Sequence, residues 1–139
     1  MSGRITVILA VLLICAVATA QTGSSSPSSA QGSTADNPIT NGPVAEYISD
    51  SAATLGWSMH GSGNTSIKYG NDREHMDQIA QATPSKDGSN YHARIEGLTP
   101  SMRYYFQVMQ NGEPVGGIGT FRTVASGAAP VRSKATIPQ

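Results

Sequence analysis

The stretch from Leu98 to Val108 constrains the fold of this chain more than any other. Apolar side chains recur there at every second position, at Tyr104, Phe106 and Val108. Successive side chains of a strand point to opposite faces, so these three share one face and the polar residues between them share the other. The stretch is therefore predicted to be a strand with one face in a core and the other in water.

A turn built on Pro100 leads into this strand. The proline ring fixes φ and drives Thr99 towards an extended conformation, which brings Leu98 back over the same core. Tyr104 then falls at the start of the strand. Its buried hydroxyl needs a partner, and the nearest unpaired groups are backbone atoms a few residues upstream. We therefore expect the tyrosine corner that is typical of Greek-key sandwiches.

The same alternation predicts the other strands. Ala53, Leu55 and Trp57 share one face of the next clear strand. Further strands are expected at 65–70, 91–96 and 117–123, with a proline-kinked edge strand at 38–44. Segment 77–81 fits a short edge strand, which we expect, or a single helical turn. Asn111-Gly112 predicts a tight hairpin, because both residues tolerate positive φ.

The predicted core is a set of large apolar or turn-forming residues on these inward faces. It consists of Trp57, Tyr69, Leu98, Pro100, Tyr104, Phe106 and Phe121. Trp57 could instead be an exposed binding platform, as in sugar-binding surfaces. We favour the core, because Trp57 continues the face of Ala53 and Leu55.

The amino-terminal residues predict export. Residues 1–20 combine a basic start at Arg4, an apolar run from 5 to 17 and the small-residue cleavage site Ala18-Thr19-Ala20. Cleavage before Gln21 would release a secreted protein, extracellular or periplasmic. A retained membrane anchor and a lipoprotein acylated at Cys15 are the alternatives. Cys15 is the only cysteine, so the exported domain would have no disulfide and would rely on packing.

Composition divides the remaining chain into three parts. Residues 21–37 are rich in serine and glycine, without large apolar side chains, and predict a disordered linker. Residues 38–124 hold all the strand signals and predict one domain, whereas 125–139 are expected to be a disordered polar tail.

The formal net charge is zero, so the composition gives no indication of binding to nucleic acid or to an acidic membrane surface.

Together these patterns resemble the fibronectin type III superfamily, which implies a seven-stranded antiparallel β-sandwich of Greek-key, immunoglobulin-like topology. The runs Ala53–Ser58, Ile67–Gly70, Gly97–Pro100, Tyr104–Val108 and Thr120–Thr123 look most like the amino-terminal sandwich of purple acid phosphatases. The metal-binding catalytic domain of those phosphatases has no counterpart in the sequence. The resemblance indicates the fold but says little about function, because the matching residues serve packing and turns.

No constellation for catalysis stands out in the sequence. His60, His75 and His92 lack the spacing that would place two metal ligands on one surface, and we interpret them as solvated surface residues. The charged run 72–74 is interpreted as a solvated face. Asn64-Thr65-Ser66 matches a glycosylation sequon, a weak signal. We therefore expect no enzyme activity, no catalytic or metal residues and no cofactor.

Three classes of function remain open. They are an exported module that binds a protein or a glycan, a structural spacer, and an accessory domain separated from a hydrolase. We favour the interaction module, because a lone domain between two flexible tails has nothing in its own chain to space apart. We expect a monomer that binds neither nucleic acid nor, once the signal is cleaved, a membrane.

Overall fold

The computed structural model describes residues 37–139. The expected signal at 1–20 and nearly all of the expected linker at 21–37 lie outside these residues. Within the described range the chain is all-β, its strand pairs are antiparallel, and it contains no helix. The strands are β1 (Ile39–Ile48), β2 (Ala52–Met59), β3 (Thr65–Gly70), β4 (Gln78–Pro84), β5 (Asn90–Glu96), β6 (Arg103–Gln110), β7 (Glu113–Arg122) and β8 (Val131–Arg132).

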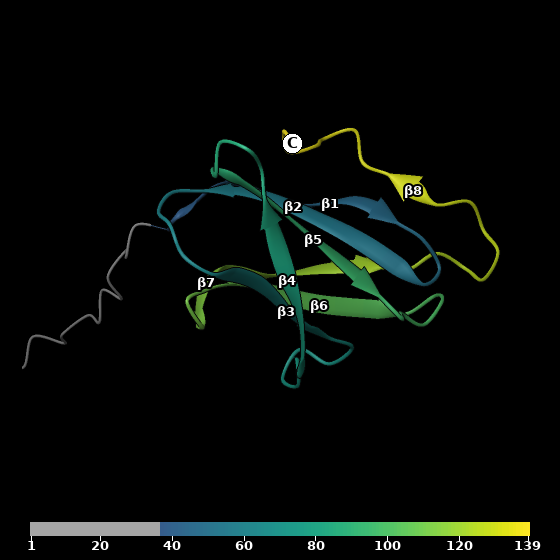
Figure 1. Ribbon diagram of the computed structural model, residues 1–139. Helices are drawn as coiled ribbons and strands as arrows, with labels where there is room; N and C mark the ends of the chain where they lie inside the picture. The colour runs from purple at the N-terminus through teal and green to yellow at the C-terminus, as the bar shows by residue number, and fades with distance from the viewer. Residues whose placement is uncertain (1–36) are drawn as a thin grey trace, which may run out of the picture. The chain divides into compact units, whose positions relative to one another are not determined.

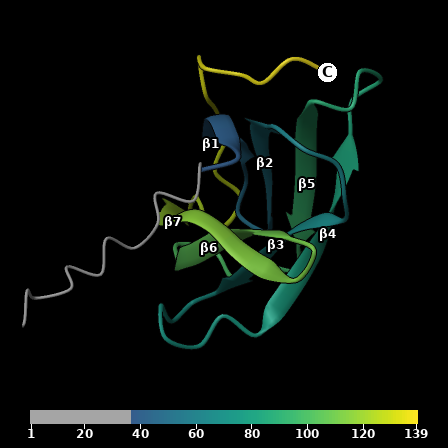
Figure 2. The same ribbon diagram turned by 90° about the vertical axis from the view of Figure 1, so that its left-hand side faces the viewer.

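The strands pair in the order β7-β6-β3-β4-β5-β2-β1-β8, which curls around one core (Figure 1). Strand β4 makes the curl possible, because its first half pairs with β3 and its last residues pair with β5. Two layers result, with β1, β2 and β5 in one and β3, β6 and β7 in the other (Figure 2). The expectation of seven strands is wrong, since the structure has eight strands in one curled series.

The core lies between the two layers and is apolar. Trp57 is fully buried and stacks on Tyr91 with ring centroids 6.0 Å apart, while Phe121 packs between Tyr104 and Phe106 at 5.6 and 6.1 Å. Six of the seven expected core residues are buried: Trp57, Tyr69, Leu98, Tyr104, Phe106 and Phe121. The seventh is exposed. Assigning Pro100 to the core was wrong, because it shapes the turn without packing inside it.

The tyrosine corner is present. The backbone N–H of Thr99 donates to the hydroxyl of Tyr104 over 2.9 Å. Thr123, the residue that follows β7, closes the same corner. The buried Thr123 hydroxyl donates to the carbonyl oxygen of Thr99 over 2.6 Å and accepts from the N–H of Met102 over 2.9 Å. Strands β6 and β7 are thus held together at this end by side-chain bonds.

Glycine lets β7 pass close to the core aromatics. Gly119 pairs with Phe106, and a Cβ at Gly119 would lie 2.3 Å from the ring. The register shift between Phe106 and Val108 beside this pair marks a β-bulge. At the other end of β7, Asn111 and Gly112 have φ of 51° and 87°, so the predicted tight hairpin is confirmed.

Segment 125–139 folds back on the domain. Strand β8 pairs with Tyr47 and Ile48 of β1 (Figure 1), and Ile137 is only 2% exposed although it lies outside the core between the layers. The expectation of a disordered tail is therefore wrong. Its residues are mainly alanine, serine and proline, and they give no periodicity from which its docking could be predicted.

Candidate functional site

A depression of about 600 Å³ lies beside β1 on the outer face of the layer formed by β1, β2 and β5. We call it the polar groove. Strands β1, β2 and β5 supply one wall and segment 132–139 supplies the other. Its lining residues are Glu46, Tyr47, Thr54, Arg94, Arg132, Ser133, Thr136, Ile137 and Gln139.

A β-bulge in β1 points two successive side chains into the polar groove. Ala45 pairs with Leu55 and Tyr47 with Thr54, so Glu46 is an extra residue in the register. Ala45 and Ile48 pack against the core, whereas Glu46 and Tyr47 line the polar groove on the opposite face. Regular alternation would have sent one of these two inward. The bulge is therefore what gives the polar groove both a carboxylate and an aromatic ring.

The carboxylate of Glu46 is nine-tenths buried and held from two sides. Oε1 accepts the backbone N–H of Ile137 over 2.5 Å, and Oε2 lies 3.3 Å from Nε2 of His92 on β5. Gly56 of β2 makes room for it, because a Cβ there would lie 2.9 to 3.0 Å from all three carboxylate atoms. A glycine on β2 thus allows a charged group to lie flat on a sheet.

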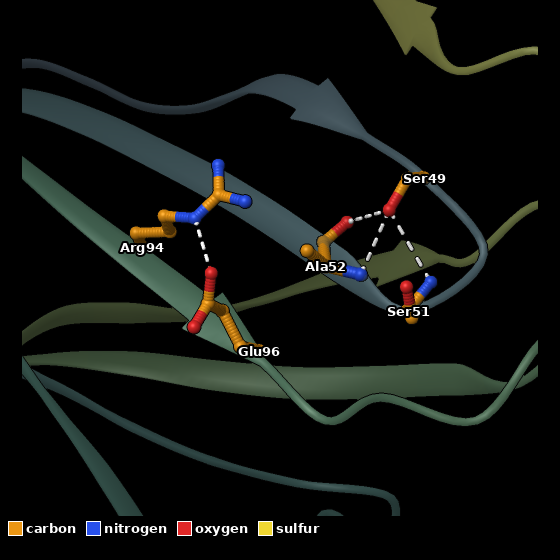
Figure 3. Close-up of polar contacts among 5 residues, drawn as sticks. All are labelled: Ser49, Ser51, Ala52, Arg94 and Glu96. Atoms are coloured by element: carbon orange, nitrogen blue, oxygen red, sulfur yellow. Dashed lines mark hydrogen bonds and ion pairs between the residues drawn. The ribbon is translucent and has the colours of Figure 1, made fainter.

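Two guanidinium groups face the same space. Arg132 lies over the ring of Tyr47 at 5.0 Å, a cation–π contact. Arg94 of β5 donates through Nε to Glu96 over 2.6 Å (Figure 3), and this bond raises the pKa of Arg94 above its ordinary value. Both groups are exposed and positively charged at neutral pH, but Arg94 is paired with Glu96, so Arg132 is the cation of the polar groove without an ion-pair partner among residues 37–139.

The turn between β1 and β2 directs segment 125–139 towards the polar groove. The Ser49 hydroxyl accepts the N–H groups of Ser51 and Ala52 and donates to the carbonyl of Ala52, which fixes the turn (Figure 3). The carbonyl of Ser49 accepts from Val124, and the Asp50 carboxylate accepts the N–H of Gly127 over 3.1 Å. The chain leaving β7 is thereby laid along β1.

The segment then follows β1 backwards. After β8 pairs with β1, the N–H of Ser133 donates to the carbonyl of Glu46 over 3.0 Å, and Ile137 reaches the carboxylate of the same residue. Each contact joins residues about eighty to ninety positions apart, from Asp50–Gly127 to Glu46–Ile137. The wall of the polar groove is therefore built by tertiary structure alone.

The expected histidine positions are only partly correct. His60 and His75 are exposed, and His75 Nδ1 lies 3.1 Å from Asp72 at the surface. His92 is wrong as a solvated residue, because its side chain is 14% exposed and contacts Glu46. Among residues 37–139 no group of three or more histidine, cysteine, aspartate or glutamate side chains is placed to hold a metal ion. No helix in that range could cross a membrane.

The sequence did not reveal the residues of the polar groove. None of its nine lining residues was among the expected core or site residues, because they come from distant parts of the sequence and together form no local pattern. Only the consecutive outward pair Glu46-Tyr47 breaks strand alternation, and that pattern could have indicated a bulge. The expected core residues meet in the core instead and leave the polar groove to others.

The fold and the polar groove define an antiparallel all-β domain with a polar depression on one outer face. Residues 36–123 match the family described as the purple acid phosphatase N-terminal domain. The match covers more than half of the chain, so the protein belongs to this family. Only the non-catalytic amino-terminal domain of the phosphatases is matched. A comparison with curated proteins gave no match.

Two solved structures that resemble the chain come from one bacterial protein. The short form of the sensor domain of the anti-sigma factor RsgI4 from Pseudobacteroides cellulosolvens is 28% identical. Its TM-score is 0.50, and the match covers 63% of this chain and 96% of that one. The long form is 25% identical with a TM-score of 0.47, covering 74% and 94%.

Proposed function

We propose that this protein is an exported, non-catalytic module that binds a protein or glycan partner in the polar groove. The observation that carries the proposal is the polar groove itself. It has the volume of a ligand site and is lined by an aromatic ring, two guanidinium groups and several hydroxyls. None of these groups is needed to fill the core, which is complete without them. Recognition of a partner gives them a role.

The comparisons support a recognition role in two ways. The matched family is an accessory domain of phosphatases and contains no catalytic part. The RsgI4 domain is described as a sensor, and we extend recognition of a signal or partner to this chain. The family also favours the second candidate, an accessory domain or spacer that works beside a separate hydrolase.

Two finer points belong to the same proposal. The tyrosine corner and the layer-switching β4 support a variant of the fibronectin type III sandwich with an added strand. Residues 1–20 support export with cleavage before Gln21, the alternatives being a retained anchor or lipidation of Cys15. Mass spectrometry of the exported protein separates these three outcomes by the mass of its amino-terminal peptide.

The function is tested by capture from the exported fraction with the whole mature chain as bait. The variant Tyr47→Ala/Arg94→Ala removes two lining groups of the polar groove. Tyr105→Ala/Arg103→Ala removes the same two residue types from β6 in the other layer. A partner that is lost with the first pair and kept with the second supports the proposal. Capture of neither a protein nor a glycan, or equal loss with both pairs, contradicts it.

A further inference from the structure

Arg132, the arginine of the polar groove without an ion-pair partner among residues 37–139, points to the chemistry of its ligand. Glu46, the one acidic residue in the lining of the polar groove, already has both carboxylate oxygens engaged, one by the N–H of Ile137 and one by His92. Arg94 uses Nε for Glu96 and keeps its terminal nitrogens, and Arg132 has no carboxylate within ion-pair distance among residues 37–139. Guanidinium groups bind carboxylates through two parallel N–H bonds, so an anionic ligand fits this space.

The other lining groups favour a hydroxylated ligand over a peptide. Thr54, Ser133 and Thr136 offer hydroxyls that can both donate and accept hydrogen bonds. An extended peptide would normally add to the free edge of a sheet, but β8 and the bond from Ser133 already occupy the edge of β1 beside the polar groove. Recognition there must use side chains, which suits a ring bearing several hydroxyls.

From this arrangement we infer that the polar groove is a subsite for an acidic carbohydrate, with Arg132 and Arg94 receiving the carboxylate of a uronic-acid unit. The inference rests on the proposed function and names the class of its partner. Tyr47 holds the guanidinium of Arg132 in place through their cation–π contact, and the hydroxyls of both walls receive the sugar hydroxyls.

The subsite exists only while segment 132–139 is docked, because that segment supplies five of the nine lining residues. These five residues lie beyond the part of the chain that matches the family, which ends at 123. The subsite is therefore built partly by residues outside the matched family domain. Glu46 acts as a positioning residue, since it holds the wall through Ile137 and its oxygens are not available to the sugar.

The test is calorimetric titration of the whole mature protein with trigalacturonic acid, with neutral galactotriose as the matched uncharged probe. We expect trigalacturonic acid to bind and galactotriose not to bind. Arg132→Ala should weaken binding about tenfold or more, the ordinary loss for a hydrogen bond to a charged group. Arg132→Lys should recover only part of the lost affinity, because lysine keeps the positive charge but lacks the two parallel N–H donors of a guanidinium group. Arg122→Ala on β7, an exposed arginine outside the polar groove, should bind normally.

A second variant separates the docked wall from the charge. Ile137→Ser leaves both arginines in the chain but removes the buried side chain of the wall, so binding should fall as far as with Arg132→Ala while circular dichroism stays that of the folded domain. Unchanged binding by Ile137→Ser overturns the role of the segment. Failure of trigalacturonic acid to bind, equal binding of galactotriose, or equal loss with Arg122→Ala overturns the subsite. Binding of a triglutamate peptide in place of the sugar also overturns it.

The two proposals fail separately. A captured partner that depends on Tyr47 and Arg94, without binding of trigalacturonic acid, leaves the binding module standing and removes the acidic carbohydrate. Binding of trigalacturonic acid without a captured protein supports both, with a glycan as the partner.

Discussion

The core and the polar groove are the two faces of the same strands, yet they are stabilised in different ways. On β2, Leu55 and Trp57 enter a core in which aromatic rings stack and no charge is present. On the opposite face, Thr54 and Gly56 leave space that a buried carboxylate and a returning chain segment fill. The core depends on buried apolar area, which many residues share. The polar groove depends on a few directional bonds, so one substitution can open it without unfolding the domain.

Trp57→Ala should have the largest effect, because it removes the most deeply buried large side chain of the core. We expect a loss of about 3 to 5 kcal/mol from a stability of about 5 to 15 kcal/mol, enough to leave the domain largely unfolded. Urea denaturation followed by far-UV circular dichroism measures it. A variant that melts like the wild type, with indole fluorescence of the wild type resembling tryptophan in water, would place Trp57 at the surface.

Gly119→Ala tests how tightly the core is packed against β7. Its new methyl group would overlap the ring of Phe106, and overpacking of this kind costs about 1 to 3 kcal/mol. The matched control is Gly117→Ala on the same strand, where a Cβ meets nothing within 4 Å. The control should be neutral or slightly stabilising in thermal melts. Equal melting temperatures for the two variants would mean that β7 can move away from the ring.

Tyr104→Phe removes only the hydroxyl of the tyrosine corner. The N–H of Thr99 then loses its acceptor, so we expect a folded domain that is less stable by about 1 to 3 kcal/mol. Tyr105→Phe, on the opposite and partly exposed face of β6, is the control and should change stability little. If the two variants have the same melting temperature, the hydrogen bond of the tyrosine corner contributes nothing to stability.

Ile137→Ala removes most of the buried side chain that docks the wall of the polar groove. It should release segment 131–139 while the core stays intact, so global unfolding should change by less than about 1 kcal/mol. Amide exchange and proteolysis within the segment should rise sharply. The control Val131→Ala alters a side chain of β8 that is 56% exposed and should leave both unchanged. Loss of global stability as large as that of Tyr104→Phe would make the segment part of the folding unit.

The smallest expected effect is a pH dependence at the start of the segment. Hydrogen bonds from the N–H of Gly127 and from the Ser51 hydroxyl lower the pKa of Asp50 below its ordinary value of 3.8. A depressed pKa in the folded state means that this contact stabilises the fold above the ordinary pKa and is lost as pH falls through the lowered value. In an NMR titration the Gly127 amide should shift with a midpoint below 3.8. A midpoint at or above that value would show that the bond is absent in solution.

Local sequence determined much of the core. Tyr104, Phe106 and Val108 alternate, and the residues that continue that pattern in β2 and β3 are buried together, because strand alternation is a property of each short segment. The corner was predictable for the same reason, since Pro100 and Tyr104 are only four positions apart. Even there the local pattern misassigned the exposed Pro100, and the corner is closed by Thr123, which lies beyond the end of β7.

The polar groove shows what only tertiary structure decided. Nothing near Glu46 in the sequence indicates that its carboxylate will be buried, since its partners are Ile137 and His92, and its space comes from Gly56. The expected number of strands was too low for a similar reason. Strand β8 is too short to show a sequence pattern and forms only by pairing with β1. The sequence by itself determined an antiparallel all-β core, through alternation and turn chemistry that act over a few residues. The docking of segment 125–139, and with it the polar groove, depends on bonds between distant residues that form only once that core exists.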